Sequence, residues 1–120
     1  MAIICSDYEA SKHFYTQIMG FTVLAENYRE ERQSYKLDLA VNDSYAIELF
    51  SFPHPPKRVS RPEASGLRHL AFEVDDIDAS VAWLDANTIE HEPVRIDEFT
   101  NKRFTFFADP DGLPIEFYEK

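Results

Sequence analysis

The amino-acid sequence predicts an α+β fold made of two βαβββ repeats, whose curved mixed sheets surround a cleft. The first observation is an internal similarity, because Ser6–Ser11 (SDYEAS) resembles Asp75–Ser80 (DDIDAS). The second is that Asp43–Phe50 (DSYAIELF) resembles Asp111–Tyr118 (DGLPIEFY), each with a glutamate directly after an isoleucine. Similarity at a nearly constant spacing indicates two copies of one structural unit.

A helix is expected after the first strand of each repeat. Asp7 and Asp76 stand where an N-cap carboxylate would meet the free N–H groups of a first helical turn. Apolar residues then recur at helical spacing, so we expect helices over residues 8–19 and 77–87. The second of these helices would place Trp83 in the core or in a pocket wall.

Alternating apolar and polar residues predict the remaining strands. The clearest runs cover residues 22–28, 34–40 and 103–108. Asp109–Gly112 (DPDG) is a strong turn signal directly after the last of them. Each repeat therefore contains one strand, one helix and then three strands.

A proline-rich stretch separates the two repeats. We expect a single domain over residues 1–120, made of modules of about 1–52 and 67–120. The linker between them would cover residues 53–66, which contain four prolines. Because neither module closes a core well alone, the modules should pair with each other or with those of another chain.

Composition excludes several classes of function. The 120-residue chain has a formal net charge of −10 and one cysteine, Cys5, within an apolar run. An acidic surface repels nucleic-acid phosphates and anionic membranes, so we expect neither partner. No apolar run approaches a bilayer-spanning length, and a single cysteine excludes an intrachain disulfide. These features favour a cytoplasmic protein that binds a small molecule.

Three polar residues interrupt apolar strands at positions where a metal could bind. Glu48 and Glu116 occupy the same place in the two repeats, and His69 stands at the head of another strand. One alternative is that each glutamate simply faces solvent. Imidazole nitrogen with carboxylate oxygen suits zinc, nickel, cobalt, manganese or ferrous iron. We expect Glu48, His69 and Glu116 to share one divalent ion, with a carboxylate also serving as a base.

The repeat also indicates where a fourth ligand would lie. Counting back from His69 by the repeat spacing reaches the position immediately before Met1. We therefore expect the natural chain to begin several residues earlier, with a histidine at that position. The remaining histidines have no counterpart at the repeat spacing, so we expect them to be structural or exposed. They are His13, His54 and His91.

Several stretches together resemble the vicinal oxygen chelate superfamily, which includes glyoxalase I, fosfomycin-resistance proteins, extradiol dioxygenases and bleomycin-resistance proteins. The likeness covers nearly the whole chain and is closest to the small bacterial glyoxalase I-like members. Asp-Pro-Asp-Gly followed by an apolar residue and glutamate is a fairly specific mark. The stretches are Ser11–Tyr15, Ile18–Phe21, Ala46–Phe50, Leu67–Phe72 and Phe106–Tyr118.

The resemblance implies a glyoxalase-like fold, a homodimer and metal ligands in the order His, Glu, His, Glu. This order assigns Glu48, His69 and Glu116 as ligands of zinc, nickel, cobalt or manganese, with iron less favoured. It implies a lyase or isomerase of the glyoxalase I type (lactoylglutathione lyase class), in which Glu48 or Glu116 moves a proton beside the chelated carbonyl of a small anionic substrate.

Three alternatives to that activity remain open. They are a ferrous-iron dioxygenase of the same fold, a non-catalytic small-molecule binding or resistance protein, and a chain that is inert because its first strand is cut short.

Basic residues indicate where an anionic substrate could dock. Lys102 and Arg103 lie where the family often has cationic loop residues, although each could equally be a solvated charge. Ile4 stands where many glyoxalase I enzymes carry an arginine that holds glutathione, which leaves the identity of the substrate open. The other basic candidates are Arg58, Arg61 and Arg68.

Overall fold

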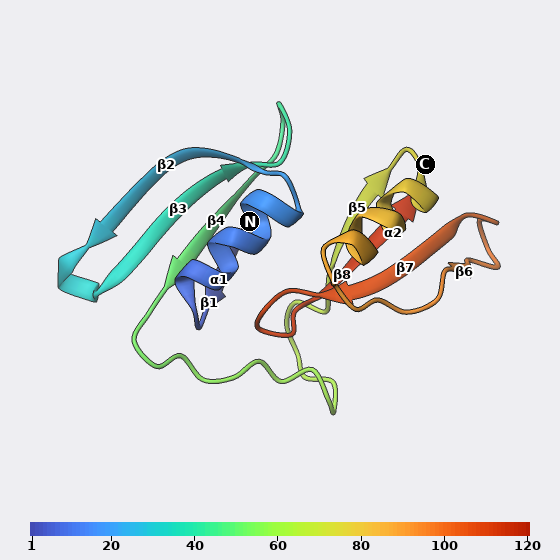
Figure 1. The fold of residues 1–120 in the computed structure, drawn as a ribbon. Coiled ribbons are helices and arrows are strands. Elements are labelled where there is room, and N and C mark those ends of the chain that lie inside the picture. The colour runs from blue at the N-terminus through green and yellow to red at the C-terminus, as the bar shows by residue number, and fades with distance from the viewer. The chain divides into compact units, whose positions relative to one another are not determined.

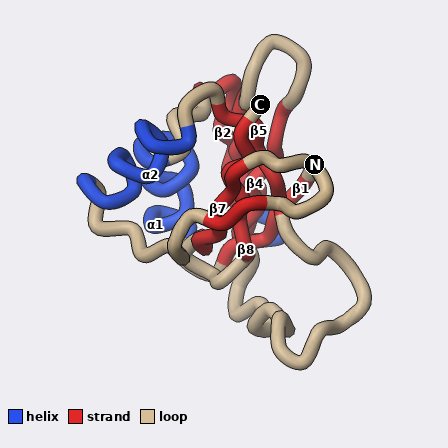
Figure 2. Tube along the Cα trace, turned by 90° about the vertical axis from the view of Figure 1, so that its right-hand side faces the viewer, coloured by secondary structure: helices blue, strands red, loops and turns tan.

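The computed structural model describes all residues, Met1–Lys120, and the chain divides into two compact units, Met1–Lys57 and Arg58–Lys120. Each unit contains one four-stranded mixed sheet and few helices, in agreement with the predicted α+β fold of two βαβββ modules. The division falls within the segment expected to be a linker. That segment connects β4 to β5 without a helix or a strand (Figure 2).

The sheet of the first unit has the strand order β1-β4-β3-β2, with α1 lying along one face (Figure 1). β1 runs parallel to β4, and the other neighbours are antiparallel. The predicted strand over residues 34–40 is confirmed, and the one over 22–28 extends by one residue. The elements are β1 (Ala2–Cys5), α1 (Tyr8–His13), η1 (Phe14–Ile18), β2 (Thr22–Arg29), η2 (Glu30–Arg32), β3 (Ser34–Ala40) and β4 (Ala46–Ser51).

The sheet of the second unit has the equivalent order β5-β8-β7-β6. β5 runs parallel to β8, while β7 is antiparallel both to β8 and to the short β6. The strand predicted over residues 103–108 is confirmed. The elements are β5 (Leu70–Val74), α2 (Ile77–Ala86), β6 (Arg95–Ile96), β7 (Arg103–Ala108) and β8 (Pro114–Glu119).

The two helices begin in the same way. Asp7 Oδ1 accepts a hydrogen bond from the N–H of Ala10 at 3.1 Å, and Asp76 Oδ1 accepts one from Ala79 at 3.0 Å. Each carboxylate satisfies an N–H group that has no partner within the helix. Both predicted caps are therefore confirmed, and the two repeats share the same capping hydrogen bond.

The helix expected over residues 8–19 is not α-helical throughout. After His13 it continues as the π-helical segment η1, in which Met19 N–H bonds to the carbonyl of Phe14 at 2.9 Å. The hydroxyl of Thr16 donates to the carbonyl of Lys12 at 2.6 Å and so uses an acceptor of the preceding turn. Such side-chain competition for a backbone carbonyl accompanies local changes in helix geometry.

Trp83, expected in the core or in a pocket wall, does not lie in the core, because it is 49% exposed. Ile77 and Leu84, seven residues apart, form the fully buried line of α2. Trp83 directly precedes Leu84, so its side chain points about 100° away from that of Leu84 around the helix axis. No helix in the structure is both long and apolar enough to cross a membrane.

Strands β3 and β4 separate a buried face from a polar one. Leu37, Leu39 and Leu49 are fully buried, whereas the alternating residues Lys36 and Glu48 remain partly exposed. Alternation follows from the pleat, which directs successive side chains to opposite faces. We call the face that carries Lys36 and Glu48 the polar face of the first sheet.

The turn before β8 is built around Asp109, a buried residue. Its Oδ1 accepts hydrogen bonds from the N–H groups of Asp111 and Leu113, both at 2.9 Å. Gly112 has a φ of +79°, a conformation that suits glycine. The predicted turn is confirmed, and it fixes where β8 begins.

Candidate metal centre

The second unit brings together two of the three predicted ligands. His69 directly precedes β5, and Glu116 lies on β8, the parallel neighbour of β5. The Nε2 atom of His69 lies 3.1 Å from Oε2 of Glu116, although the residues are 47 positions apart in the sequence. Strand pairing therefore creates an imidazole–carboxylate pair at one edge of the second sheet.

This pair is partly shielded from water. The side chain of Glu116 is 13% exposed and that of His69 is 32% exposed. Phe106, opposite Glu116 on β7, meets the His69 ring edge to face, with centroids 5.0 Å apart. The aromatic ring restricts the orientation of the imidazole.

The pair fits a divalent ion in donor type and in spacing. Two bonds of about 2.1 Å, at angles between about 90° and 109°, hold their donor atoms about 3.0 to 3.4 Å apart. The separation of 3.1 Å between His69 Nε2 and Glu116 Oε2 lies in that range, and it is also the length of the direct hydrogen bond between the two side chains. Imidazole with carboxylate is a donor set that zinc, nickel, cobalt and manganese accept.

Arg58 holds the segment that leads into His69. Its Nη2 donates to the carbonyls of Leu67 at 2.6 Å and Arg68 at 2.8 Å, and its Nε donates to Ser60 Oγ at 2.8 Å. Leu67 and Arg68 are the two residues immediately before His69. Arg58 therefore positions the backbone from which the imidazole projects, and most of its donors are already in use.

Glu48, the third predicted ligand, lies on β4 in the first unit. Its side chain is 42% exposed, and its Oε2 lies 3.4 Å from Nζ of Lys36. The same ammonium lies 3.2 Å from Oδ1 of Asp38, and the hydrogen bond to Asp38 raises the pKa of Lys36. Asp38 is also the cross-strand partner of Glu48. Two facing carboxylates thus share one cation.

Sequence reasoning did not single out Lys36 and Asp38. Both alternate with buried leucines in Ser34–Ala40, and this alternation would have placed them on the same face as Glu48. Within either unit, no group of three His, Cys, Asp or Glu side chains could hold a metal ion.

Strand register makes the two glutamates equivalent. Ala2 pairs with Glu48 on parallel strands, and Ala71 pairs with Glu116 in the same way. His69 lies two positions before Ala71. The corresponding position in the first unit directly precedes Met1, as the sequence spacing indicates.

The basic residues considered as substrate contacts are mostly paired with acids. Arg103 lies 3.1 Å from both Asp78 and Glu119, so two carboxylates neutralise it. Arg61 and Arg68 are exposed, at 3.6 Å and 3.7 Å from Glu63. The carbonyl of Lys102 accepts a bond from Asp97 N–H in the loop before β7.

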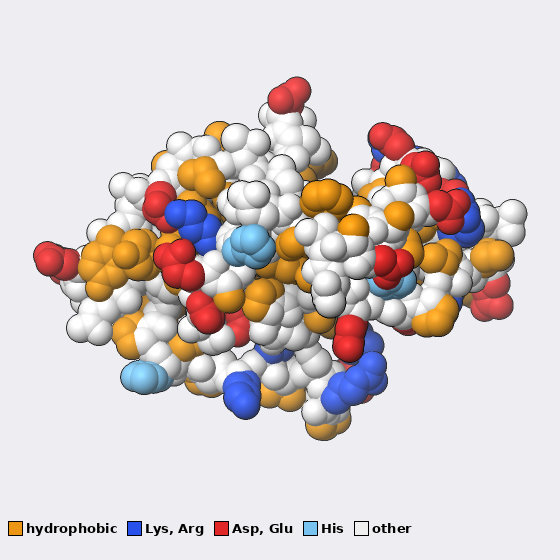
Figure 3. Space-filling model, viewed as in Figure 1, with side chains coloured by type: hydrophobic (Ala, Val, Ile, Leu, Met, Phe, Trp, Pro, Cys, Tyr) orange, Lys and Arg blue, Asp and Glu red, His pale blue; other side chains and the backbone are white.

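His13 and His54 are exposed, as expected, and His91 is structural. The Nδ1 of His91 lies 2.8 Å from the carbonyl of Glu92, and its Nε2 lies 2.7 Å from Oδ1 of Asp85. The contact with the Glu92 carbonyl is the larger cause, and together with the contact to Asp85 it raises the pKa of His91. Further acidic side chains gather over α2 (Figure 3).

A pocket of about 550 Å³ adjoins His91 at the end of α2. None of the three predicted ligands lines it, so it is separate from the His69–Glu116 pair. Its lining residues are Asp85, Thr88, Ile89, Glu90 and His91.

Comparison with known proteins identifies related sequences and folds. Residues 1–117 match the sequence model of the Glyoxalase/Bleomycin resistance protein/Dioxygenase superfamily. Protein YwkD of Bacillus subtilis is 63% identical over 120 residues, which are all of this chain and 94% of that protein. A probable lactoylglutathione lyase of Vibrio cholerae is 30% identical over 115 residues, 92% of this chain and 80% of that protein.

The same relationship appears among solved structures. The crystal structure of a glyoxalase family protein from Enterococcus faecalis superposes with a TM-score of 0.92 and 50% identity. The alignment covers 99% of this chain and 94% of that one. Sequence and fold therefore point to the same group of proteins.

Proposed function

Because the chain belongs to the glyoxalase/bleomycin resistance protein/dioxygenase superfamily, we propose that it is a metal-dependent lyase or isomerase of the glyoxalase I type (lactoylglutathione lyase class). The observation that supports this most directly is the His69–Glu116 pair, whose donor atoms are spaced for one ion. The Vibrio cholerae relative, named as a probable lactoylglutathione lyase, supports the reaction class.

His69, Glu116 and Glu48 are the residues that would hold the divalent ion, with zinc, nickel, cobalt or manganese as the favoured metals. When bound, such an ion supplies Lewis-acid polarisation of a carbonyl oxygen, which lowers the pKa of the neighbouring C–H group. Glu48 or Glu116 would accept the proton from one carbon of the substrate and return it to the next. The partly shielded carboxylate of Glu116 is suited to short-range transfer because little water competes for it.

We also propose that the protein acts as a cytoplasmic homodimer. All eight residues of β2 lie at or near the surface, and none is buried. Leu24 is 62% exposed and Ile4, on β1, is 57% exposed. Apolar side chains on exposed strands favour contact with a second copy. Light scattering coupled to gel filtration would report twice the monomer mass of 14.0 kDa.

Metal analysis of protein purified without a polyhistidine tag tests the proposed function. We expect about one transition metal per chain in the wild type, and loss of that metal in Glu116→Ala and in His69→Ala. Zinc, nickel, cobalt or manganese would then be tested for conversion of a methylglyoxal–thiol adduct to a thioester. Iron together with oxygen consumption would instead favour a dioxygenase. Failure to bind any metal after its addition would overturn the proposal and leave a small-molecule binding protein.

A further inference from the structure

Arg29, the last residue of β2, is held in a fixed position on the polar face of the first sheet. Its guanidinium carbon lies 4.9 Å from the ring centroid of Phe50 and 5.9 Å from that of Phe52. Its Nη2 donates to the hydroxyl of Ser34, a fully buried residue, at 3.0 Å. Two aromatic rings and one fixed hydroxyl therefore orient the planar guanidinium.

No carboxylate pairs with Arg29, although the chain contains 22 acidic residues. Its Nε atom is buried and has no hydrogen-bond acceptor. Arg95 provides the contrast, because it also stacks on a phenylalanine, Phe104 at 4.7 Å, but pairs with Glu92 at 2.8 Å. Arg29 thus keeps a positive charge, and its Nη atoms keep N–H groups beyond the one that bonds to Ser34, so an anionic ligand would accept hydrogen bonds from these groups.

The position of Arg29 relates it to a predicted ligand within the same unit. Phe50, which lies under the guanidinium, is two residues after Glu48 on β4 and so points to the same face. Two residues of a strand span about 7 Å. Lys36 is the cross-strand partner of Phe50 and contacts Glu48, but Asp38 and Glu48 already neutralise it. Arg29 is therefore the uncompensated cation beside Glu48.

We propose that Arg29 binds an oxyanion, a carboxylate or a phosphate, of the substrate whose reacting end lies at Glu48. A planar guanidinium presents parallel N–H groups that match either oxyanion in a bidentate manner. The inference rests on the proposed function, because it takes Glu48 as part of the reaction site. It assigns the specificity for an anionic substrate to Arg29 and not to Arg103, whose charge is already neutralised.

Titration of metal-free protein with malonate and with inorganic phosphate tests the assignment. Removing the metal ensures that neither probe binds through an ion. The readouts are the dissociation constant from calorimetry and the NMR shift of the Arg29 Nε–H signal. The variants are Arg29→Met, Arg29→Lys and the matched control Arg95→Met, which removes a stacked but neutralised arginine. Thermal unfolding of each variant verifies that it folds.

We expect wild type and Arg95→Met to bind at least one probe with dissociation constants within about twofold of each other. Arg29→Met should bind about tenfold or more weakly, and Arg29→Lys should be intermediate because it retains charge without the planar fork. The tighter probe would identify the group as carboxylate or phosphate. Equal binding by wild type and Arg29→Met, or no binding by wild type, would overturn the inference.

The outcome is separable from that of the proposed function. Anion binding lost with Arg29→Met in a protein that takes up no metal would contradict only the metal-dependent reaction. Normal metal content in a protein that binds neither anion would contradict only the role of Arg29. Should Arg29→Met fail to fold, Arg29→Lys decides. Wild-type affinity in Arg29→Lys, together with an Arg29 Nε–H signal in the wild-type protein that neither probe moves, would count against the assignment.

Discussion

The imidazole of His69 lies 3.1 Å from the carboxylate of Glu116, across two parallel strands that begin 44 residues apart at Leu70 and Pro114. Each side chain alone has a structural explanation, as a hydrogen-bonded histidine or as a glutamate beside a sheet edge. Together they present a nitrogen and an oxygen donor in one partly shielded place, and this is the property that a shared metal ion requires.

Replacing Glu116 by glutamine should weaken metal binding by about tenfold or more, because an amide keeps the volume but loses the charged oxygen donor. Competition with a chromogenic chelator would measure the affinity. Glu98→Gln, an exposed residue in the loop before β7, serves as the control and should bind metal like the wild type. Equal affinities in the two variants would remove Glu116 from the ligand set.

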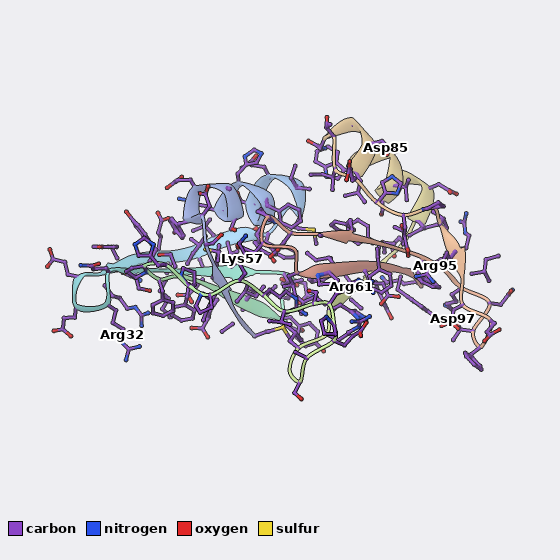
Figure 4. The ribbon with its side chains drawn as sticks, turned by 90° about the horizontal axis from the view of Figure 1, so that it is seen from below. Arg32, Lys57, Arg61, Asp85, Arg95 and Asp97 are labelled. Atoms are coloured by element: carbon purple, nitrogen blue, oxygen red, sulfur yellow. The ribbon has the colours of Figure 1, made fainter.

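Arg58→Met should lower both stability and metal affinity, because the carbonyls just before His69 lose their donor. Loss of hydrogen bonds from a charged group costs about 1 to 3 kcal/mol in the free energy of unfolding. Urea denaturation and the chelator assay would measure the two effects. Arg61→Met, which removes an exposed arginine of the same segment (Figure 4), should change neither. A metal affinity unchanged in Arg58→Met would mean that His69 does not depend on this loop.

His91 should stabilise the fold more at low pH than at high pH. Both of its nitrogens face acceptors, Glu92 O and Asp85 Oδ1, so both contacts are made fully only by the protonated ring. Since folding raises the pKa of His91, its contribution is complete below the unfolded value of about 6.5 and disappears as pH rises through the folded value.

His91→Gln should accordingly destabilise the protein more near pH 5.5 than near pH 9, because the neutral ring donates to only one of its two acceptors. Thermal unfolding across this range would measure the difference. His13→Gln changes an exposed histidine and should show no such pH dependence. An equal loss of stability at both pH values would contradict a contribution from protonation.

Asp109→Ala should destabilise the second unit by about 1 to 3 kcal/mol, because two N–H groups of the turn lose their acceptor. Asp109→Asn keeps an Oδ1 acceptor and should retain most of the stability. Urea unfolding followed by fluorescence would compare the two variants. Equal losses would show that the charge of Asp109, and not the accepting oxygen, stabilises the turn.

The fold could be predicted in outline because its determinants are local and repeated. Asp7 and Asp76 cap their helices through the same atom, and the strand spacing places Glu48 and Glu116 opposite equivalent alanines. Periodicity did not predict the change to π-helical hydrogen bonding after His13, which involves the hydroxyl of Thr16. Helical spacing also does not distinguish Trp83 from its buried neighbour Leu84.

The candidate site was only partly predictable for a related reason. His69 and Glu116 interrupt apolar strands, which makes them visible in the sequence. Arg29 lies at a strand end among other charged residues, and its stacking on Phe50 and its hydrogen bond to Ser34 distinguish it. Arg32, three residues later, is exposed at the end of the same hairpin (Figure 4). Which of the two arginines is held against aromatic rings depends on tertiary contacts, and sequence spacing does not predict these contacts.

A histidine added directly before Met1 should strengthen metal binding, because that position relates to Glu48 as His69 relates to Glu116. Ala2 pairs with Glu48 just as Ala71 pairs with Glu116, and Glu48 N–H bonds to the carbonyl of Met1 at 2.8 Å. A chain with Met-His ahead of Met1 should therefore bind zinc or nickel about tenfold or more tightly than one with Met-Gln there. The chelator assay would compare the two, and Glu48→Gln should abolish the difference between them. If the two extended chains bind metal equally, the first unit does not reproduce the His–Glu pair of the second. The two repeats would then share their backbone structure but not their metal-binding side chains.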